Sequence, residues 1–380
     1  MPLVVICAGS SWDGVAGSDR HLASALTRFA RILWVDPAIS PLGPARFRQS
    51  SLRPPFLLVA AAPGVTRFSP WVLPFHTRRV LRAVSPRLVR AQIRWAVARL
   101  GDRPHAVISC GLNDQLGGWG DGVLNVVYGT DDFVSGAELM GVDPQWSARQ
   151  EQREISQSDL VIAVSPTLCD RWAAMGARVA LVPNGVSIAA YENMGTAPAI
   201  KDPHLPGPVV GLVGHLSARI DIALLEGVVN AGCSLLLVGP HDPRWEAERF
   251  RALAAHHRVR WVGRRPFSEL PSFLRHMDVG ITPYRDTEFN RASFPLKTLE
   301  YLAAGLPAVS TDLPATRWLK TDLVRVADDE RGFIEATVAA ADESADPQLV
   351  AQRRSFATQH SWCSRAADVA RILGLSKDVV

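Results

Sequence analysis

The sequence has 380 residues, of which 47% are apolar and 21% charged, a composition that excludes an intrinsically disordered chain. A chain of this length exceeds the size at which one hydrophobic core stops growing, so two domains are expected. The net charge of +4 is too small to indicate a nucleic-acid partner, although it suits anionic substrates or an anionic membrane surface. The five scattered cysteines contain no C-x-x-C pair, which predicts a reducing, cytoplasmic location and no structural zinc site.

Short apolar runs alternate with longer amphipathic stretches in the first half of the chain. Met1–Cys7 lacks a basic leader and is predicted to be a buried strand, and Asp19–Arg31 is predicted to be a helix. No apolar run reaches the ~20 residues that span a bilayer, so any membrane contact would be peripheral. The strands predicted here are Leu3–Cys7, Ile32–Val35, Val107–Ser109, Leu124–Tyr128, Leu160–Val164 and Ala180–Val182.

Asn184–Pro208, rich in Pro, Gly and Asn, interrupts this alternation and marks a domain boundary. The alternation then resumes, and the whole pattern predicts βα units and parallel sheets, whose ligands bind at the carboxyl ends of the strands. The strands predicted after the boundary are Val209–Val213, Ser234–Val238, Val259–Val262, Val279–Thr282 and Ala308–Ser310.

The usual nucleotide motifs are absent, because the early glycines do not fit G-x-G-x-x-G and no Gly-Lys-Ser/Thr follows a strand. This disfavours a dehydrogenase or a P-loop ATPase. The run Gly211–Asp221 instead reads as a strand ending in Gly214, a polar loop and a helix start, where backbone N–H groups suit a diphosphate. An ordinary βα turn with Asp221 as helix cap is the alternative.

The stretch "SFPLKTLEYLAAGLP" predicts a short helix from Pro295 to Ala304, with Gly305 as its stop signal. Lys297 and Glu300 lie three residues apart, on one face near the helix start. A lysine neutralises phosphate, and a carboxylate accepts hydrogen bonds from the two hydroxyls of a ribose. The pair therefore suits a nucleoside diphosphate, and a weak surface ion pair is the alternative.

Four segments, "VPNGV", "VGLVGHLSARID", "VRWVGRRPFSELPSFLRHMDVGITPY" and "PLKTLEYLAAGLPAVST", resemble in this order the GT-B glycosyltransferases, especially the GT4-like group. The first half is more loosely similar, through "SSWDGVAGSDRHLASAL" and "VVYGTDDF", to bacterial cell-envelope glycosyltransferases of the teichuronic-acid type. The resemblance implies two Rossmann-like domains facing across a cleft: an acceptor domain at 1–190, a nucleotide-sugar domain at 205–355, and a C-terminal helix at 356–380 that returns to the first domain.

The resemblance also implies the donor site. Glu300 would bind the ribose hydroxyls, and the Gly214 loop with His215 and Arg219 would bind the diphosphate. Arg264 and Tyr284 would flank the base, with a solvated turn and a core position as their alternatives. The segment beside the phosphates and the sugar would be Ser293, Phe294, Pro295, Leu296 and Lys297.

Two positions depart from the family pattern. The group commonly carries Glu-x7-Glu, but the residue eight before Glu300 is Ala292, which leaves the donor sugar and the stereochemistry open. The Arg-x4-Lys phosphate pair is incomplete, because Leu224 stands five residues after Arg219. Lys297 is therefore expected to supply the missing cation.

On the acceptor side, a carboxylate is needed to accept the proton of the attacking hydroxyl. Asp131 and Asp132 follow the strand Leu124–Tyr128, and because adjacent side chains point apart, one is expected in the site and the other in a turn. The alternative is that Asp131 and Asp132 are both turn residues. Asp13 is a weaker candidate. A true base would lead to inversion, and its absence to retention.

Residues 68–79 combine aromatic side chains with arginines and precede a basic helical stretch that includes Arg82, Arg87, Arg90, Arg94 and Arg99. This resembles a surface that meets anionic lipid at the inner face of the plasma membrane. The alternative is an ordinary surface helix that packs through Val80, Leu81, Val84 and Leu88.

Taken together, these features predict a metal-independent hexosyltransferase that needs no cofactor, uses a UDP- or GDP-sugar, and acts on a saccharide or lipid-linked acceptor. A sugar-nucleotide epimerase of the same fold is the alternative among enzymes. A catalytically silent nucleotide-sugar-binding protein is the alternative outside them, because the first Glu of the family motif is missing.

Overall fold

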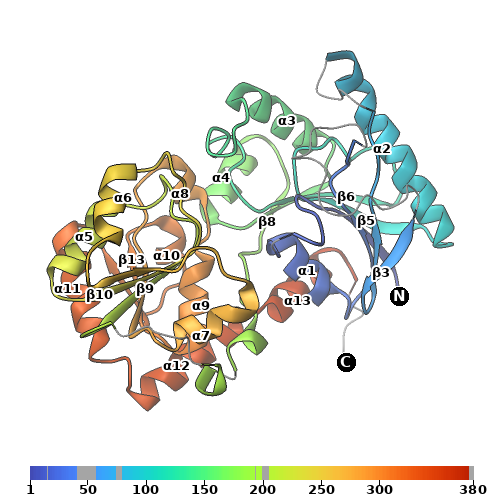
Figure 1. Cartoon of the computed structure of the whole chain (residues 1–380). Helices are drawn as coiled ribbons and strands as arrows, with labels where there is room; N and C mark the ends of the chain where they lie inside the picture. Colours follow the sequence, from blue (N-terminus) through green and yellow to red (C-terminus); the bar gives the residue numbers. More distant parts are fainter. Residues whose placement is uncertain (15, 41–56, 74–78, 193, 199–204, 376–380) are drawn as a thin grey trace. The chain divides into compact units, whose positions relative to one another are not determined.

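The computed structural model describes residues 1–14, 16–40, 57–73, 79–192, 194–198 and 205–375. The chain divides into two compact units, the first formed by Met1–Pro183 with Trp362–Val380 and the second by Asn184–Ser361. Each unit is a parallel or mostly parallel sheet with helices packed on it (Figure 1). This confirms the predicted α/β class with two Rossmann-like domains.

The sheet of the first unit has the strand order β3-β4-β2-β1-β5-β6-β7-β8. All its pairs are parallel except β3 with β4. The apolar run "LVVIC" forms the buried β1, as predicted. The strands are β1 (Leu3–Cys7), β2 (Arg31–Val35), β3 (Leu58–Ala62), β4 (Val65–Phe68), β5 (Pro104–Ser109), β6 (Leu124–Gly129), β7 (Leu160–Ala163) and β8 (Val179–Leu181).

The helices of this unit include one from the far end of the sequence. α13 packs against α1, where the rings of His21 and Trp362 stack 5.5 Å apart (Figure 1). The predicted helix Asp19–Arg31 was too long, because Arg31 already pairs with Leu3 in the sheet. The helices are α1 (Ser18–Leu26), α2 (Arg79–Arg99), α3 (Pro144–Ser156), α4 (Pro166–Ala174) and α13 (Trp362–Ile372).

The basic helix α2 does not pack as predicted. Val84 and Leu88 are exposed, and the helix buries Val89, Ile93 and Ala96 instead. Arg90 and Arg94 donate hydrogen bonds to carbonyl oxygens of the loop after β5, so these two arginines hold a loop in place. Phe68, expected among the aromatics of a lipid-facing surface, is a core residue. Pro74–Arg78 of that segment lies outside the described residues.

The sheet of the second unit has the order β11-β10-β9-β12-β13-β14, and all its pairs are parallel. Its strands are β9 (Val209–Val213), β10 (Ser234–Val238), β11 (Val259–Trp261), β12 (Val279–Thr282), β13 (Ala308–Thr311) and β14 (Val324–Ala327). Its helices are α5 (Ile222–Asn230), α6 (Ala247–Ala254), α7 (Leu270–Leu274), α8 (Glu288–Ala292), α9 (Leu296–Ala304), α10 (Pro314–Trp318), α11 (Glu330–Ala341) and α12 (Pro347–Gln359).

A membrane-spanning helix is not found in the described part of the chain, since none of its helices is both long and apolar enough.

Candidate functional site

The loop after β9 and the loop after β10 pack closely against each other at the carboxyl edge of the second unit's sheet. The Gly214 N–H donates to the Val238 carbonyl at 2.9 Å, and a Cβ built on Gly239 would lie 1.7 Å from the Gly214 carbonyl oxygen. Gly239 also has φ 151°, so only glycine fits there. A Cβ on Gly214 would meet no described atom within 4 Å, which leaves space over its backbone. His215, next in the loop, is exposed.

Arg219 is held by α8 and by two aromatic rings. Its Nε donates to Asn290 Oδ1 at 2.9 Å, and its guanidinium lies over the rings of Tyr284 and Phe289, 5.1 and 4.7 Å from their centroids. The Asn290 amide in turn donates to the carbonyls of Arg219 and Arg285. Because only Nε is engaged by Asn290, the two terminal nitrogens are oriented as a fork that suits an anion.

α9 is fixed to the sheet by a buried tyrosine. The Tyr301 hydroxyl accepts from the Val213 N–H at 2.9 Å and donates to the Ile281 carbonyl at 3.3 Å. Its ring lies against Gly280 of β12, where an added Cβ would come within 2.2 Å of the ring. The sheet therefore determines the position of the helix face that carries Lys297 and Glu300.

Lys297 and Glu300 form the expected pair, with Lys297 Nζ 2.7 Å from Glu300 Oε2. The side chain of Glu300 is 7% exposed and that of Lys297 23%, so this is not an ordinary surface ion pair. Burial, and then the charge of Glu300, raise the pKa of Tyr191. Glu300 is thus a buried anion whose described cation is one partly exposed lysine.

The other predicted donor residues divide into core and surface positions. Ser293, Phe294 and Pro295 are buried between α8 and α9, with the Phe294 ring 6.2 Å from that of Trp318. Leu296 begins α9 and is half-buried. Tyr284 packs on the core as well as under Arg219, and Arg264 is exposed after β11.

In the first unit, Asp132 is a turn residue, and both oxygens of its carboxylate already accept hydrogen bonds. Its carboxylate accepts from the N–H groups of Val134 and Ser135, from the Ser135 hydroxyl, and from Arg171 at 2.6 Å. Burial opposes ionisation, but the bonds from Arg171 and Ser135 prevail and lower its pKa. Such an anion is poorly suited to take a proton. Asp131 is half-buried, and its charge helps to raise the pKa of Tyr128.

Asp13 is likewise held by an arginine. Arg67 of β4 is buried, and its guanidinium reaches Asp13 at 2.7 Å, Asp36 at 2.6 Å and the Ser11 hydroxyl at 3.1 Å. The Asp13 side chain is half-exposed. The first unit also contains a cavity of about 970 Å³, and none of Asp13, Asp131 and Asp132 lines it.

We expect Asp132→Asn to lower the free energy of unfolding by about 2 kcal/mol at neutral pH, because Arg171 and the turn amides lose a charged partner. Because the pKa of Asp132 is lowered in the folded state, its contribution is present above the unfolded pKa and is lost as the pH falls. Urea unfolding at pH 7 and pH 3 measures this difference. An equal loss at both values would contradict it.

The comparisons with known proteins agree with this geometry. The family model described as "Glycosyl transferases group 1" matches residues 208–343, the part of the second unit that carries Gly214, Arg219, Lys297 and Glu300. Residues 208–343 are thus similar to the group 1 glycosyltransferases.

Two curated relatives have transferase names. TuaH of Bacillus subtilis (strain 168), named for glycosyl transfer in teichuronic acid biosynthesis, is 28% identical over 45% of this chain and 44% of its own length. Phosphatidyl-myo-inositol mannosyltransferase of Mycolicibacterium smegmatis is 28% identical over 56% of both chains. The aligned part of the chain thus spans about half the length of these relatives.

Solved structures of low sequence identity share the GT-B fold. Sucrose-phosphate synthase of Thermosynechococcus elongatus matches with a TM-score of 0.68 and 17% identity over 98% of both chains. HepE of Anabaena, solved in complex with UDP, matches with a TM-score of 0.64 and 13% identity over 98% of this chain and all of that one.

The two departures from the pattern of the similar family have structural counterparts. Leu224, at the position of the usual lysine, lies in α5 and is buried in the core, so the fold places no cation there. Ala292 is also buried. Asn290, two residues earlier, holds Arg219, and this residue escaped the sequence analysis because a lone Asn in a short helix carries no motif.

Proposed function

We propose that this protein transfers a hexose-type sugar from a nucleotide-diphosphate sugar to a saccharide or lipid-linked acceptor in cell-envelope glycan synthesis. The observation that carries the proposal is the buried Glu300 carboxylate, paired with Lys297 at the start of a helix that Tyr301 fixes to the sheet. A buried carboxylate with a partly exposed cation beside it suits the hydroxyls and phosphates of one nucleotide.

In this proposal Glu300 accepts the ribose hydroxyls, and Lys297 and the Arg219 fork bind the diphosphate, with the Gly214 backbone close to it. A UDP- or GDP-sugar is the proposed donor. The UDP-sugar is supported by solved structures of similar fold that contain UDP or UDP-glucose. The names of the two curated relatives support an envelope acceptor.

On the acceptor side we propose Asp131, which follows β6 and lies outside the cavity wall, as the group that accepts the hydroxyl proton. The carboxylates of Asp132 and Asp13 are each paired with an arginine, which makes them weak bases. We further propose that the protein works in the cytoplasm at the inner face of the plasma membrane, where nucleotide sugars and lipid-linked acceptors meet. Its five free cysteines fit a reducing compartment.

A thermal-shift screen of UDP-, GDP-, ADP- and TDP-sugars tests the donor, because a ligand that binds the native state raises the unfolding midpoint. The preferred donor is then incubated with envelope lipid extract, and the products are separated. A sugar that becomes attached to an acceptor supports transfer. A product that is only an isomerised nucleotide sugar would indicate an epimerase, and binding without any product would indicate a silent binding protein.

Transfer is expected to survive EDTA, because Arg219 and Lys297 supply fixed cations for the diphosphate. Initial rates measured with and without chelator should agree within a factor of about two. Loss of activity that Mg²⁺ or Mn²⁺ restores would contradict this prediction.

A further inference from the structure

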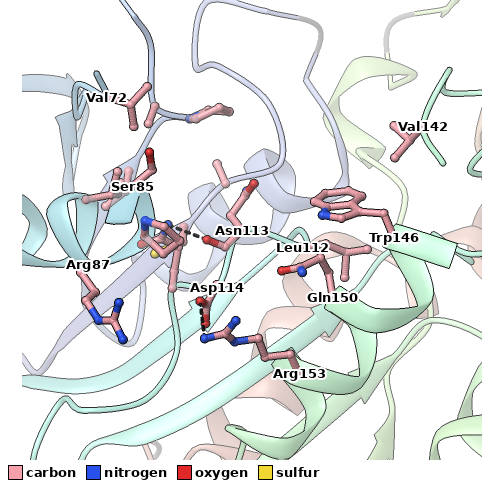
Figure 2. A pocket seen from close by; sticks show the side chains of 18 of the residues that line it. Val72, Ser85, Arg87, Leu112, Asn113, Asp114, Val142, Trp146, Gln150 and Arg153 are labelled. Carbon is pink, nitrogen blue, oxygen red and sulfur yellow. Dashed lines mark hydrogen bonds and ion pairs between the residues drawn. The ribbon is translucent and has the colours of Figure 1, made fainter. Parts of the chain in front are cut away.

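The cavity of the first unit lies at the carboxyl ends of β1, β2 and β5, beside α2 and α3 (Figure 2). It has a volume of about 970 Å³, enough for a sugar with substituents. Val72 and Leu112 give it apolar walls, while Asn113 and Gln150 extend amide groups toward the hollow (Figure 2).

One face of α3 supplies the cavity with its most distinctive chemistry. Trp146, Arg149, Gln150 and Arg153 all line it, at positions i, i+3, i+4 and i+7 of the helix. The opposite face of α3 is the one that packs inward, through Ser147, Glu151, Glu154 and Ile155. The cavity therefore has an aromatic ring, an amide and two guanidinium groups along a single rigid element.

These side chains match the parts of an acidic sugar. An indole face covers the apolar C–H face of a pyranose ring, and amide groups donate to and accept from hydroxyls. A guanidinium pairs with a carboxylate or phosphate through two parallel bonds. The set provides all three functions within two turns of one helix.

Apart from Arg149, the charged side chains that line the described cavity have interaction partners. Arg153 pairs with Asp114 at 3.2 Å, Asp36 pairs with Arg67, and Asp143 caps α3 by accepting from the Trp146 N–H at 2.7 Å. Arg149, by contrast, forms no ion pair with any residue that the structure describes.

We propose that this cavity binds an acidic saccharide unit of the acceptor, with the sugar ring against Trp146 and the carboxylate or phosphate at Arg149. This rests on the proposed transferase function and adds the chemical class of the acceptor. The same groups, a polyol ring with an attached anion, are present in a free or glycan-borne sugar acid and in the inositol phosphate headgroup of a lipid.

Binding is measured by calorimetry on the whole protein with four soluble probes: glucuronate, glucose 1-phosphate, glucose and inorganic phosphate. Both acidic sugars are expected to bind at least about tenfold more tightly than glucose or phosphate. Arg149→Gln and Trp146→Ala should each weaken the acidic sugars at least about tenfold. Arg178→Gln, an exposed arginine of the same unit outside the cavity, is the matched control and should change nothing.

A second arm uses vesicles of phosphatidylcholine with either phosphatidylinositol or phosphatidylglycerol. If the protein sediments with the phosphatidylinositol vesicles and not with the phosphatidylglycerol vesicles, and Arg149→Gln abolishes this sedimentation, the ligand is the inositol phosphate headgroup of the lipid. Equal binding to both vesicles that Arg149→Gln leaves intact, together with no binding of the acidic sugars, would overturn the proposal. The proposal would also be overturned if neither Arg149→Gln nor Trp146→Ala changed the affinity for the acidic sugars.

UDP binding, titrated on the same samples, separates this inference from the proposed function. Wild-type protein that binds UDP but neither acidic sugar nor phosphatidylinositol refutes the acceptor class alone. Failure to bind any nucleotide refutes the donor site, whatever the cavity binds.

Discussion

Glu300→Gln is expected to weaken binding of the preferred nucleotide at least about tenfold while the protein stays folded. A carboxylate that accepts hydroxyl hydrogen bonds in a buried site contributes roughly 1.5–3 kcal/mol per bond, and each ~1.4 kcal/mol is a factor of ten in affinity. The amide is of similar size and has a single acceptor oxygen, so the loss reports hydrogen bonding more than packing.

Removing Glu300 also releases Lys297, which sits 2.7 Å from it. Each variant is therefore titrated with both the nucleoside and the nucleoside diphosphate. Glu300→Gln should weaken both ligands, since both carry the ribose, whereas Lys297→Ala should weaken the diphosphate alone. Glu248→Gln, an exposed position on α6, serves as the control. Unchanged affinity in Glu300→Gln would remove the ribose assignment.

Glu154→Gln is expected to raise the stability of the protein at pH 8 by up to about 3 kcal/mol and to leave it nearly unchanged at pH 4.5. Glu154 is buried under the loop after β5, where the Asp114 N–H donates to it. Burial raises its pKa from 4.5 to about 7, against the opposing effect of the amides of residues 113–115.

The sign follows from proton binding in the two states. Between pH 4.5 and about 7 the folded protein keeps the Glu154 proton that the unfolded chain has lost, so stability falls as the pH rises through this window. Glutamine has no proton to lose, and the variant escapes that fall. Urea unfolding from pH 4.5 to 8 measures it, with exposed Glu138→Gln as control. Parallel curves for wild type and Glu154→Gln would contradict the prediction.

Much of the sheet architecture could be predicted because its strands are continuous apolar runs. β1, β9, β10 and β12 have the predicted bounds, since a strand covered on both faces carries no polar interruption. The hairpin of β3 and β4 was missed. Its alanine-rich first strand is only half-buried, and its second contains Arg67, whose burial depends on Asp36 and Asp13 from elsewhere in the chain.

The proposed donor residues Lys297 and Glu300 could be selected from the sequence because one short helix carries them in a recognisable pattern. The residues that position them could not. Asn290 meets Arg219 across 71 positions, and Tyr301 reaches Val213 across 88. The cavity of the first unit was missed for a similar reason, because Trp146, Arg149 and Gln150 on their own are typical of the solvated side of an amphipathic helix. Helical spacing becomes informative only when a cavity is known to adjoin that face.

The pairing of α13 with α1 has a consequence for the order in which the chain acquires its structure during synthesis. The second unit is continuous in sequence, so it can fold as soon as residue 361 has left the ribosome. The first unit is translated earlier but lacks α13, so the surface of α1 that packs against α13 stays uncovered until then. Translation therefore completes the later-coded unit before the earlier one, the reverse of the usual order for two-domain proteins.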